Sequence, residues 1–236
     1  MNLLFIDVET TGFPKNSAVI EIACIPVIDG IKQKHFHSYI KPHPGAYIDP
    51  KAMEVNKIDV NLFHTFPEAN IVLQNLIAFI DSFECPFTIA GHNAPFDRDK
   101  VHALFSRNAM YGDYITRFSS KTVCTMEMAK RLIKEKSVKY SLKDLCARYS
   151  IKLDSAHSAL PDIQATVDLY DILKTLEMAP TRANDNLSYP EKKKKYFDSK
   201  YIQINPDGTI YMTTFTMNDP VAIKFIFSEL WALYAD

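Results

Sequence analysis

Two carboxylates, Asp7 and Glu9, follow the apolar residues near the start of the chain, in the stretch LFIDVETTGF at positions 4–13. Residues 2–8 have the pattern of a buried strand. Because side chains at positions i and i+2 of a strand point to the same face, both acids project together from its carboxyl end. Neighbouring carboxylates raise each other's pKa unless a cation lies between them. Such oxygen ligands suit Mg²⁺ or Mn²⁺, and two solvated acids at an exposed strand end are the alternative.

A third acid, Asp97, lies near the start of a predicted helix, in the stretch GHNAPFDRD at positions 91–99. Asn93 is a favoured N-cap residue, and Pro95 suits the first helical turn. Asp97 precedes Val101 by four residues and therefore shares the apolar face of this helix. A carboxylate on an apolar face is costly unless it is paired or faces a metal ion. The alternative is that Asp97 satisfies the N-terminus of its own helix.

A histidine and a fourth acid, His157 and Asp162, occur in the stretch AHSALPD at positions 156–162. On one helix, two side chains five residues apart would diverge by about 140°. Pro161 favours the first helical turn, so His157 is expected in the preceding loop, where it can fold back. Asp162 is then expected at the positive end of the helix, on the face that packs against a sheet. A lone histidine in a loop often has no catalytic role, so this pattern is weak by itself.

In their order and spacing, the three clusters together resemble the motifs of the DEDD exonuclease superfamily, the DnaQ-like group with a ribonuclease H-like fold. The resemblance covers residues 1–178. The spacing His-x4-Asp is typical of the histidine branch, and Ser158 stands where the tyrosine branch has its tyrosine. The stretch YSLKDLCARY at 140–149 is similar to bacterial proofreading subunits, and VCTMEMAKRL at 123–132 is similar to exodeoxyribonuclease X-type enzymes.

The resemblance implies an activity, a cofactor and a set of site residues. The activity is stepwise 3′→5′ hydrolysis of single strands, which releases nucleoside 5′-monophosphates. The cofactor is a pair of divalent ions, Mg²⁺ or Mn²⁺, and His157 would take the proton from the attacking water. The implied metal ligands are Asp7, Glu9, Asp97 and Asp162, and the implied substrate-binding residues are Thr10, Thr11, Gly12, Phe13, Asn56, Asn93 and Phe96.

Three of the implied substrate residues have alternative readings. Asn56 stands where the family often has a histidine, so one contact to the 3′ end departs from the family pattern. Gly12 lets the backbone approach the nucleotide closely, or it is a turn residue. Phe96 flanks the bound nucleic-acid strand, or it belongs to the protein core.

The elements that must position these residues have an α/β pattern. Strands are expected at 18–28 and 31–40, on either side of the turn Asp29-Gly30, and a short strand is expected at 86–91. Helices are expected at 67–83, from about Asn93, and at 124–134, 141–149 and 160–178. Strands that give way to alternating strands and helices predict an α/β layered domain. The expected fold is therefore a ribonuclease H-like mixed sheet flanked by helices.

The expected domain organisation has three parts. Residues 1–179 form the exonuclease domain, and residues 180–200 form a polar, proline-containing linker with a lysine run. Residues 201–236 form a ββα appendage, whose two strands flank the turn Asn205–Gly208. A unit of about 35 residues is too small to be stable alone. The appendage therefore packs on the exonuclease domain, on a second copy of the chain, or on a partner such as a DNA polymerase.

The overall charge and the cysteines exclude several other classes. The formal net charge is −1, with 27 Lys and Arg against 28 Asp and Glu, so nucleic acid must be held by a local patch or by metal ions. Four scattered cysteines without a C-x-x-C pair argue against a zinc site and a disulfide framework. No signal peptide and no membrane span are expected, because the first apolar run lacks a basic flank and is broken by Asp7. A cytoplasmic protein is the expectation.

Three functions follow from these residues. The first is a DNA exonuclease for proofreading or repair, which acts on single-stranded 3′ ends. The second is a 3′→5′ exoribonuclease or oligoribonuclease, because the motifs do not distinguish DNA from RNA. The third is a non-catalytic module that binds nucleic acid or a polymerase. The presence of all five predicted catalytic residues argues against this third function.

Overall fold

The structure, a computed structural model, describes residues 2–83, 86–133, 137–153, 158–178, 202–204 and 210–212. The chain divides into two compact units, Met1–Leu173 and Lys174–Asp236. The predicted site residues that the structure describes all belong to the first unit. The boundaries predicted at residues 179 and 201 stay predictions.

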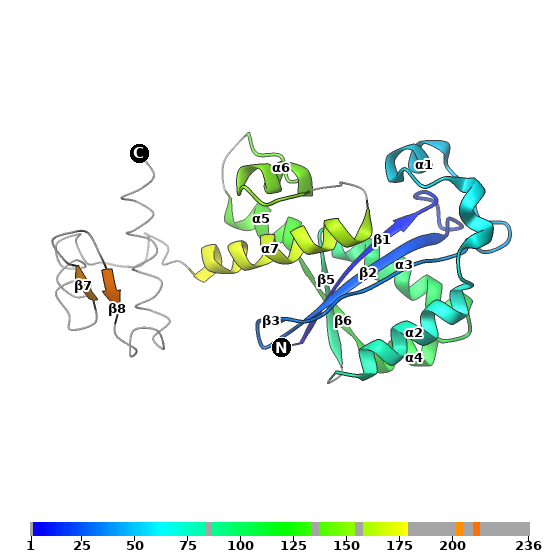
Figure 1. The fold of residues 1–236 in the computed structure, drawn as a ribbon, viewed down its shortest axis with the longest axis horizontal. Helices are drawn as coiled ribbons and strands as arrows, with labels where there is room; N and C mark the ends of the chain where they lie inside the picture. Colours follow the sequence, from blue (N-terminus) through cyan, green and yellow to red (C-terminus); the bar gives the residue numbers. More distant parts are fainter. Residues whose placement is uncertain are drawn as a thin grey trace. The chain divides into compact units, whose positions relative to one another are not determined.

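The first unit is built on a mixed sheet with the strand order β3-β2-β1-β5-β6, and β4 also pairs with β2 (Figure 1). Strand β1 is antiparallel to β2 and parallel to β5, and β5 is parallel to β6. The strands are β1 (Leu3–Thr10), β2 (Val19–Ile28), β3 (Ile31–Lys32), β4 (Phe36–Tyr39), β5 (Phe87–Gly91) and β6 (Phe118–Cys124). The predicted fold class, a mixed sheet flanked by helices, is confirmed.

Helices lie on both faces of this sheet, and the alternation along β1 separates the two faces. Leu4 and Ile6 pack in one core cluster with residues of α2 and α3, whereas Leu3 and Phe5 pack in another with residues of α7. Asp7 and Glu9 continue the second series and therefore lie on the α7 face. The helices are α1 (Pro50–Asn56), the 3₁₀ helix η1 (Val60–Thr65), α2 (Ala69–Asp81), α3 (Ala94–Arg107), α4 (Tyr111–Arg117), α5 (Thr125–Leu132), α6 (Leu142–Arg148) and α7 (Ala159–Met178).

The strand predicted at residues 31–40 is interrupted, because β3 ends at Lys32 and β4 begins at Phe36. The neighbouring strand β2 contains Pro26, whose carbonyl accepts a hydrogen bond from Gln33 N–H at 2.9 Å. On that side of β2 the next ladder bond would need an N–H from Pro26, which proline lacks. The register shifts by one residue between the β3 and β4 pairings for this reason.

The second unit contains two short strands in its described part. β7 (Ile202–Ile204) and β8 (Ile210–Met212) pair antiparallel, on either side of the turn predicted from the sequence. The predicted linker at 180–200, the turn itself and the predicted C-terminal helix lie outside the described residues.

Two further expectations concern the described residues as a whole. Within these ranges, no helix combines the length and the apolar character needed to cross a membrane. Cys24, Cys124 and Cys146 are free thiols, as expected from their scattered positions, and Cys85 lies outside the described residues.

Candidate metal centre

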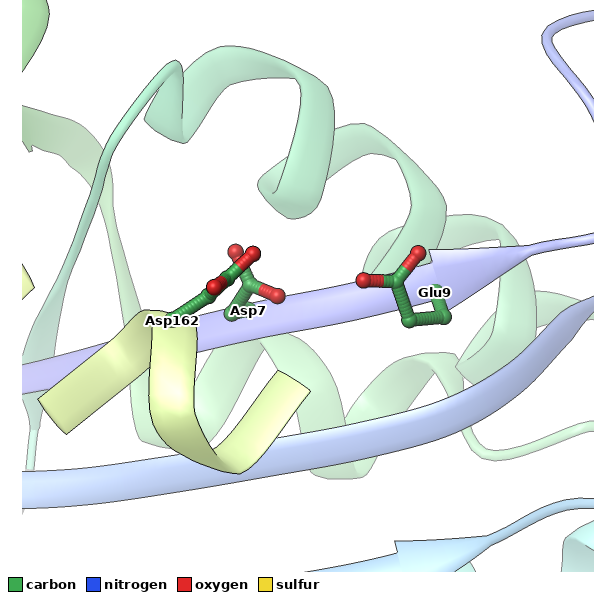
Figure 2. A group of neighbouring side chains, drawn as sticks. All are labelled: Asp7, Glu9 and Asp162. Atoms are coloured by element: carbon green, nitrogen blue, oxygen red, sulfur yellow. The ribbon is translucent and has the colours of Figure 1, made fainter. Parts of the chain in front are cut away.

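Three carboxylates meet at the carboxyl end of β1. Asp7 and Glu9 project from the strand, and Asp162 reaches them from the first turn of α7, as Figure 2 shows. One oxygen of each carboxylate lies within 4.8 Å of the other two. The apolar side chains Ile163 and Val167 bind α7 to the sheet, in the same core cluster as Phe5. The helix that carries Asp162 is therefore held against β1 by burial of its apolar face.

Burial and neighbouring negative charges destabilise the charged forms of Asp7 and Glu9. Burial raises the pKa of Asp7 well above its ordinary value, and the charges of Asp97, Glu9 and Asp162 raise it further. Burial, followed by the charges of Asp162 and Glu21, raises the pKa of Glu9 to about 8. A divalent cation would relieve this repulsion, and carboxylate oxygens are the donors that hard divalent cations prefer. The donor set therefore fits a divalent metal ion.

Asp97 contacts the same strand end from α3. Its carboxylate accepts the N–H of Val8 at 3.2 Å, and its side chain is buried, as predicted from its helical face. Burial raises the pKa of Asp97, although hydrogen bonds from backbone N–H groups oppose the increase. Gly91, the last residue of β5, permits the close approach of β5 to β1, because a Cβ there would lie 2.9 Å from the carbonyl oxygen of Ile6 and 3.5 Å from Asp97 Oδ2. Asp97 thus borders the three-carboxylate group without being part of it.

The start of α3 differs in detail from the sequence expectation. Asn93 occupies the N-cap position, but its side chain makes no capping hydrogen bond. Its backbone has φ of 80°, a left-handed conformation that asparagine adopts more readily than most residues. Asn93 therefore starts α3 through its left-handed backbone conformation and not through a capping side chain, which is exposed.

The loop after β1 is fixed by its own threonines. Thr10 Oγ1 donates to the Gly12 carbonyl at 2.9 Å. Thr11 Oγ1 donates to the Tyr47 carbonyl at 2.6 Å and accepts the N–H of Ala18 at 2.8 Å. Both threonine side chains are buried. Their predicted role in substrate binding stays a prediction, and in this structure they shape the loop.

Two more residues of the predicted substrate site brace the same loop. Asn56, at the end of α1, donates from Nδ2 to the Thr10 carbonyl at 3.0 Å. Gly12 has φ of 150°, and a Cβ there would lie 3.1 Å from Asp49 Cβ. Gly12 therefore permits a close approach of this loop to Asp49, and its predicted approach to the nucleotide stays a prediction.

Two of the predicted substrate-binding residues are phenylalanines whose rings contact each other. Phe13 is 82% exposed, and its ring meets the ring of Phe96 edge to face, with centroids 6.0 Å apart. Phe96 is half-buried and also packs against the core. An exposed aromatic ring is costly to keep in water, and it provides a surface on which a base can stack.

Sequence reasoning missed a further acid, Glu21. It lies on β2 opposite Glu9 and is 1% exposed. His37 Nε2 donates to its carboxylate at 2.7 Å, and Ser158 Oγ donates to it at 3.3 Å. The available signal was an acid inside an otherwise apolar ten-residue strand, VIEIACIPVI. His157, the predicted proton acceptor next to Ser158, lies outside the described residues.

A mixed sheet covered on both faces, with carboxylates at the carboxyl end of its first strand, defines the class of nucleases with a ribonuclease H-like fold. The family model described as Exonuclease (RNase_T) matches residues 4–170. The chain therefore belongs to this exonuclease family, and it is a 3′→5′ exonuclease.

Individual relatives agree with this assignment. The chain is 25% identical to the DNA polymerase III subunit epsilon of Aquifex aeolicus, over 73% of this chain and 79% of that protein. It is 31% identical to ribonuclease T of Buchnera aphidicola, over 70% of this chain and 80% of that protein. A crystal structure of E. coli exonuclease I in complex with a dT13 oligonucleotide shares the fold, with a TM-score of 0.63 and 18% identity. That similarity covers 75% of this chain and 41% of exonuclease I.

Proposed function

We propose that the protein removes nucleotides one at a time from the 3′ ends of single-stranded DNA, in proofreading or repair. The observation that carries this proposal is the group of Asp7, Glu9 and Asp162, whose oxygens lie within 4.8 Å of one another in a chain of the exonuclease family. Similarity to a DNA polymerase III subunit and to an exonuclease I solved with dT13 supports DNA as the substrate. The first similarity also supports association with a DNA polymerase.

In this proposal Asp7, Glu9 and Asp162 hold the divalent ions, Mg²⁺ or Mn²⁺, and Asp97 assists from α3. Two such ions, when bound, neutralise the phosphodiester charge and stabilise the attacking and leaving oxygens. Asp97 keeps the strand end in place through its bond to the Val8 N–H. His157 accepts a proton from the attacking water, as a histidine that titrates near neutral pH can.

The exposed ring of Phe13 stacks on the terminal base, and Phe96 holds the Phe13 ring in place through their edge-to-face contact. Stacking is tolerant of sequence because every base has a π face. The remaining predicted contacts, from Asn93 and from the loop at residues 10–12, position the terminal nucleotide. Removal of any mismatched 3′ base requires this tolerance.

A second candidate substrate is the 3′ end of RNA. The observation that favours it is the 31% identity to a ribonuclease T, over 80% of that protein. DNA and RNA present the same phosphodiester to the carboxylates, so the 2′-hydroxyl contacts decide between the substrates.

The test is digestion of 5′-labelled single-stranded DNA and of RNA of the same sequence, with Mg²⁺, Mn²⁺ or EDTA. The proposal expects a ladder that shortens from the 3′ end, requires the metal and is faster on DNA, while a circular single strand stays intact. His157→Ala should lose the activity, and His35→Ala, an exposed histidine in the segment between β3 and β4, should keep it. Faster digestion of RNA would select the second candidate, and no shortening of either polymer would refute both.

A further inference from the structure

A groove lies outside the carboxylate site, between α3, the start of α2 and the loop after β1. Its volume is about 160 Å³. Sites for small molecules typically occupy roughly 300–1,000 Å³, so this groove is small for a free metabolite. Four Lys or Arg residues contribute to its lining, namely Lys15, Lys41, Lys100 and Arg107, and Glu68 is the one acid among the lining residues.

In the described part of the chain, an acid pairs with one of the four cations that line this groove. Glu68 is paired with Lys41 at 2.6 Å. Lys100 Nζ donates to Ser17 Oγ at 2.6 Å and to the Pro14 carbonyl at 3.1 Å, which are neutral acceptors. Burial lowers the pKa of Lys100, and the charge of Arg107 lowers it further. An anion in the groove would relieve this repulsion between cations.

The groove continues from the predicted position of the 3′ end. Lys100 Nζ lies 5.4 Å from the ring centroid of Phe96, which in turn contacts Phe13. From Asp97 to Arg107, α3 rises by about 15 Å. In a duplex each strand carries one phosphate per roughly 3.4 Å of helix axis, and the phosphates of an extended single strand are farther apart, so this length accommodates at most about four nucleotides.

We propose that this groove binds the phosphates of the substrate strand, one to about four nucleotides upstream of the scissile bond. The inference rests on the proposed function and adds the path of the polynucleotide to it. Lys15 in the loop after β1 and Arg107 at the end of α3, both exposed, contact the phosphates, while Lys100 holds the loop after β1. Contacts of this kind position a strand and carry no sequence information, as an exonuclease that degrades any sequence requires.

The experiment compares the wild type with Lys15→Gln/Arg107→Gln and with a control of equal charge change, Lys34→Gln/Lys121→Gln. The two control lysines are exposed and do not line the groove. Binding of 5′-fluorescein (dT)12 and (U)12 is measured by anisotropy in EDTA, at 50 to 200 mM salt. Cleavage of (dT)12 and of the dinucleotide (dT)2 is measured with Mg²⁺. In (dT)2 the single phosphodiester is the scissile one, so the substrate cannot enter the groove.

Each lost phosphate contact lowers the slope of log K against log salt by about 0.7 for single strands. The groove variant lacks two contacts, so the magnitude of its slope should be smaller than that of the wild type by about 1.4. The factor by which affinity decreases between 50 and 200 mM salt should therefore be about seven times smaller for the variant than for the wild type. The change should be the same for (dT)12 and (U)12, because both carry the same phosphates. KM for (dT)12 should rise, while the cleavage of (dT)2 and the behaviour of the control stay unchanged.

The possible failures are distinguishable. If the wild type cleaves (dT)12 but the groove variant keeps the wild-type salt slope and KM, the groove inference is wrong and the proposed function stands. Equal losses for (dT)2 and (dT)12 would also overturn the inference, because they would place the two cations at the reaction site. If the wild type cleaves neither substrate, the proposed function fails, and the binding slope alone then decides whether the groove holds phosphates.

Discussion

Replacement of Glu9 by glutamine should stabilise the metal-free protein at alkaline pH. Glu9 lies next to Asp7 and Asp162. Burial, followed by the charges of Asp162 and Glu21, raises its pKa from an ordinary 4.5 to about 8. Glutamine has nearly the same shape but carries no charge, so it removes the repulsion and preserves the packing. The carboxylate is therefore predicted to cost stability in the absence of metal.

The size and sign of this effect follow from proton linkage. Between pH 4.5 and 8 the folded chain holds a proton on Glu9 that the unfolded chain has released. The free energy of unfolding therefore falls as the pH rises through this window, by up to about 1.4 kcal/mol per pH unit. The upper limit over the whole window is about 5 kcal/mol, and shared protonation among neighbouring acids reduces it to an expected ~2–3 kcal/mol. Glu9→Gln should be more stable than the wild type by this amount at pH 8 and equally stable at pH 4.5.

Urea denaturation in EDTA at several pH values measures this difference, and Glu54→Gln on the exposed face of α1 is the control. Saturating Mg²⁺ should narrow this difference at pH 8, because a ligand at 100 times its Kd adds about 2.7 kcal/mol to the wild type and the glutamine variant binds the ion more weakly. A metal-free Glu9→Gln protein with the same pH dependence as the wild type would refute the electrostatic reasoning.

Two further predictions separate substrate binding from folding. Phe13→Ala should raise KM for single-stranded DNA by about 5- to 150-fold without lowering Tm, because roughly 1–3 kcal/mol of base stacking is lost. The control is Tyr111→Ala, which removes an exposed aromatic ring on α4. An equal rise of KM in the control would contradict a specific role of Phe13 in base stacking. Ile163→Ala should destabilise the fold by about 2–5 kcal/mol in urea denaturation, because the side chain is fully buried between α7 and the sheet. Ile115→Ala, 54% exposed, should change stability by less than about 0.5 kcal/mol, and similar losses in both variants would refute this account of the core.

Local patterns in the sequence predict most of the elements that carry the site. The alternation in β1 places Asp7 and Glu9 on one face, and the helical periodicity before Val101 buries Asp97. Both predictions required only the side-chain periodicity of the element, which is two residues in a strand and about 3.6 residues in a helix. Strand β6 (FSSKTVC) was missed because it has neither an apolar run nor a clear alternation. It is a strand because it pairs in parallel with β5, a contact between segments about 30 residues apart.

The remaining details of the site depend on contacts between distant residues. Thr11 bonds to the Tyr47 carbonyl, 36 positions away, and Ser158 bonds to Glu21, 137 positions away. No period or propensity encodes such pairs, so the structural contacts of the threonines were not predicted and Glu21 was overlooked. The interrupted strand at 31–40 was foreseeable, since Pro26 in the neighbouring strand cannot donate a ladder bond.

The central claim is that Asp7, Glu9 and Asp162 together hold divalent metal. Calorimetric titration of Mn²⁺ into the wild type and into Asp7→Asn at pH 7, in two buffers of different ionisation enthalpy, tests it most directly. The wild type should bind Mn²⁺ and release protons, because the raised pKa of Glu9 leaves that group protonated before the metal binds. Asp7→Asn should fold and bind Mn²⁺ at least tenfold more weakly. Equal Mn²⁺ affinity in the two proteins, without proton release, would contradict the account.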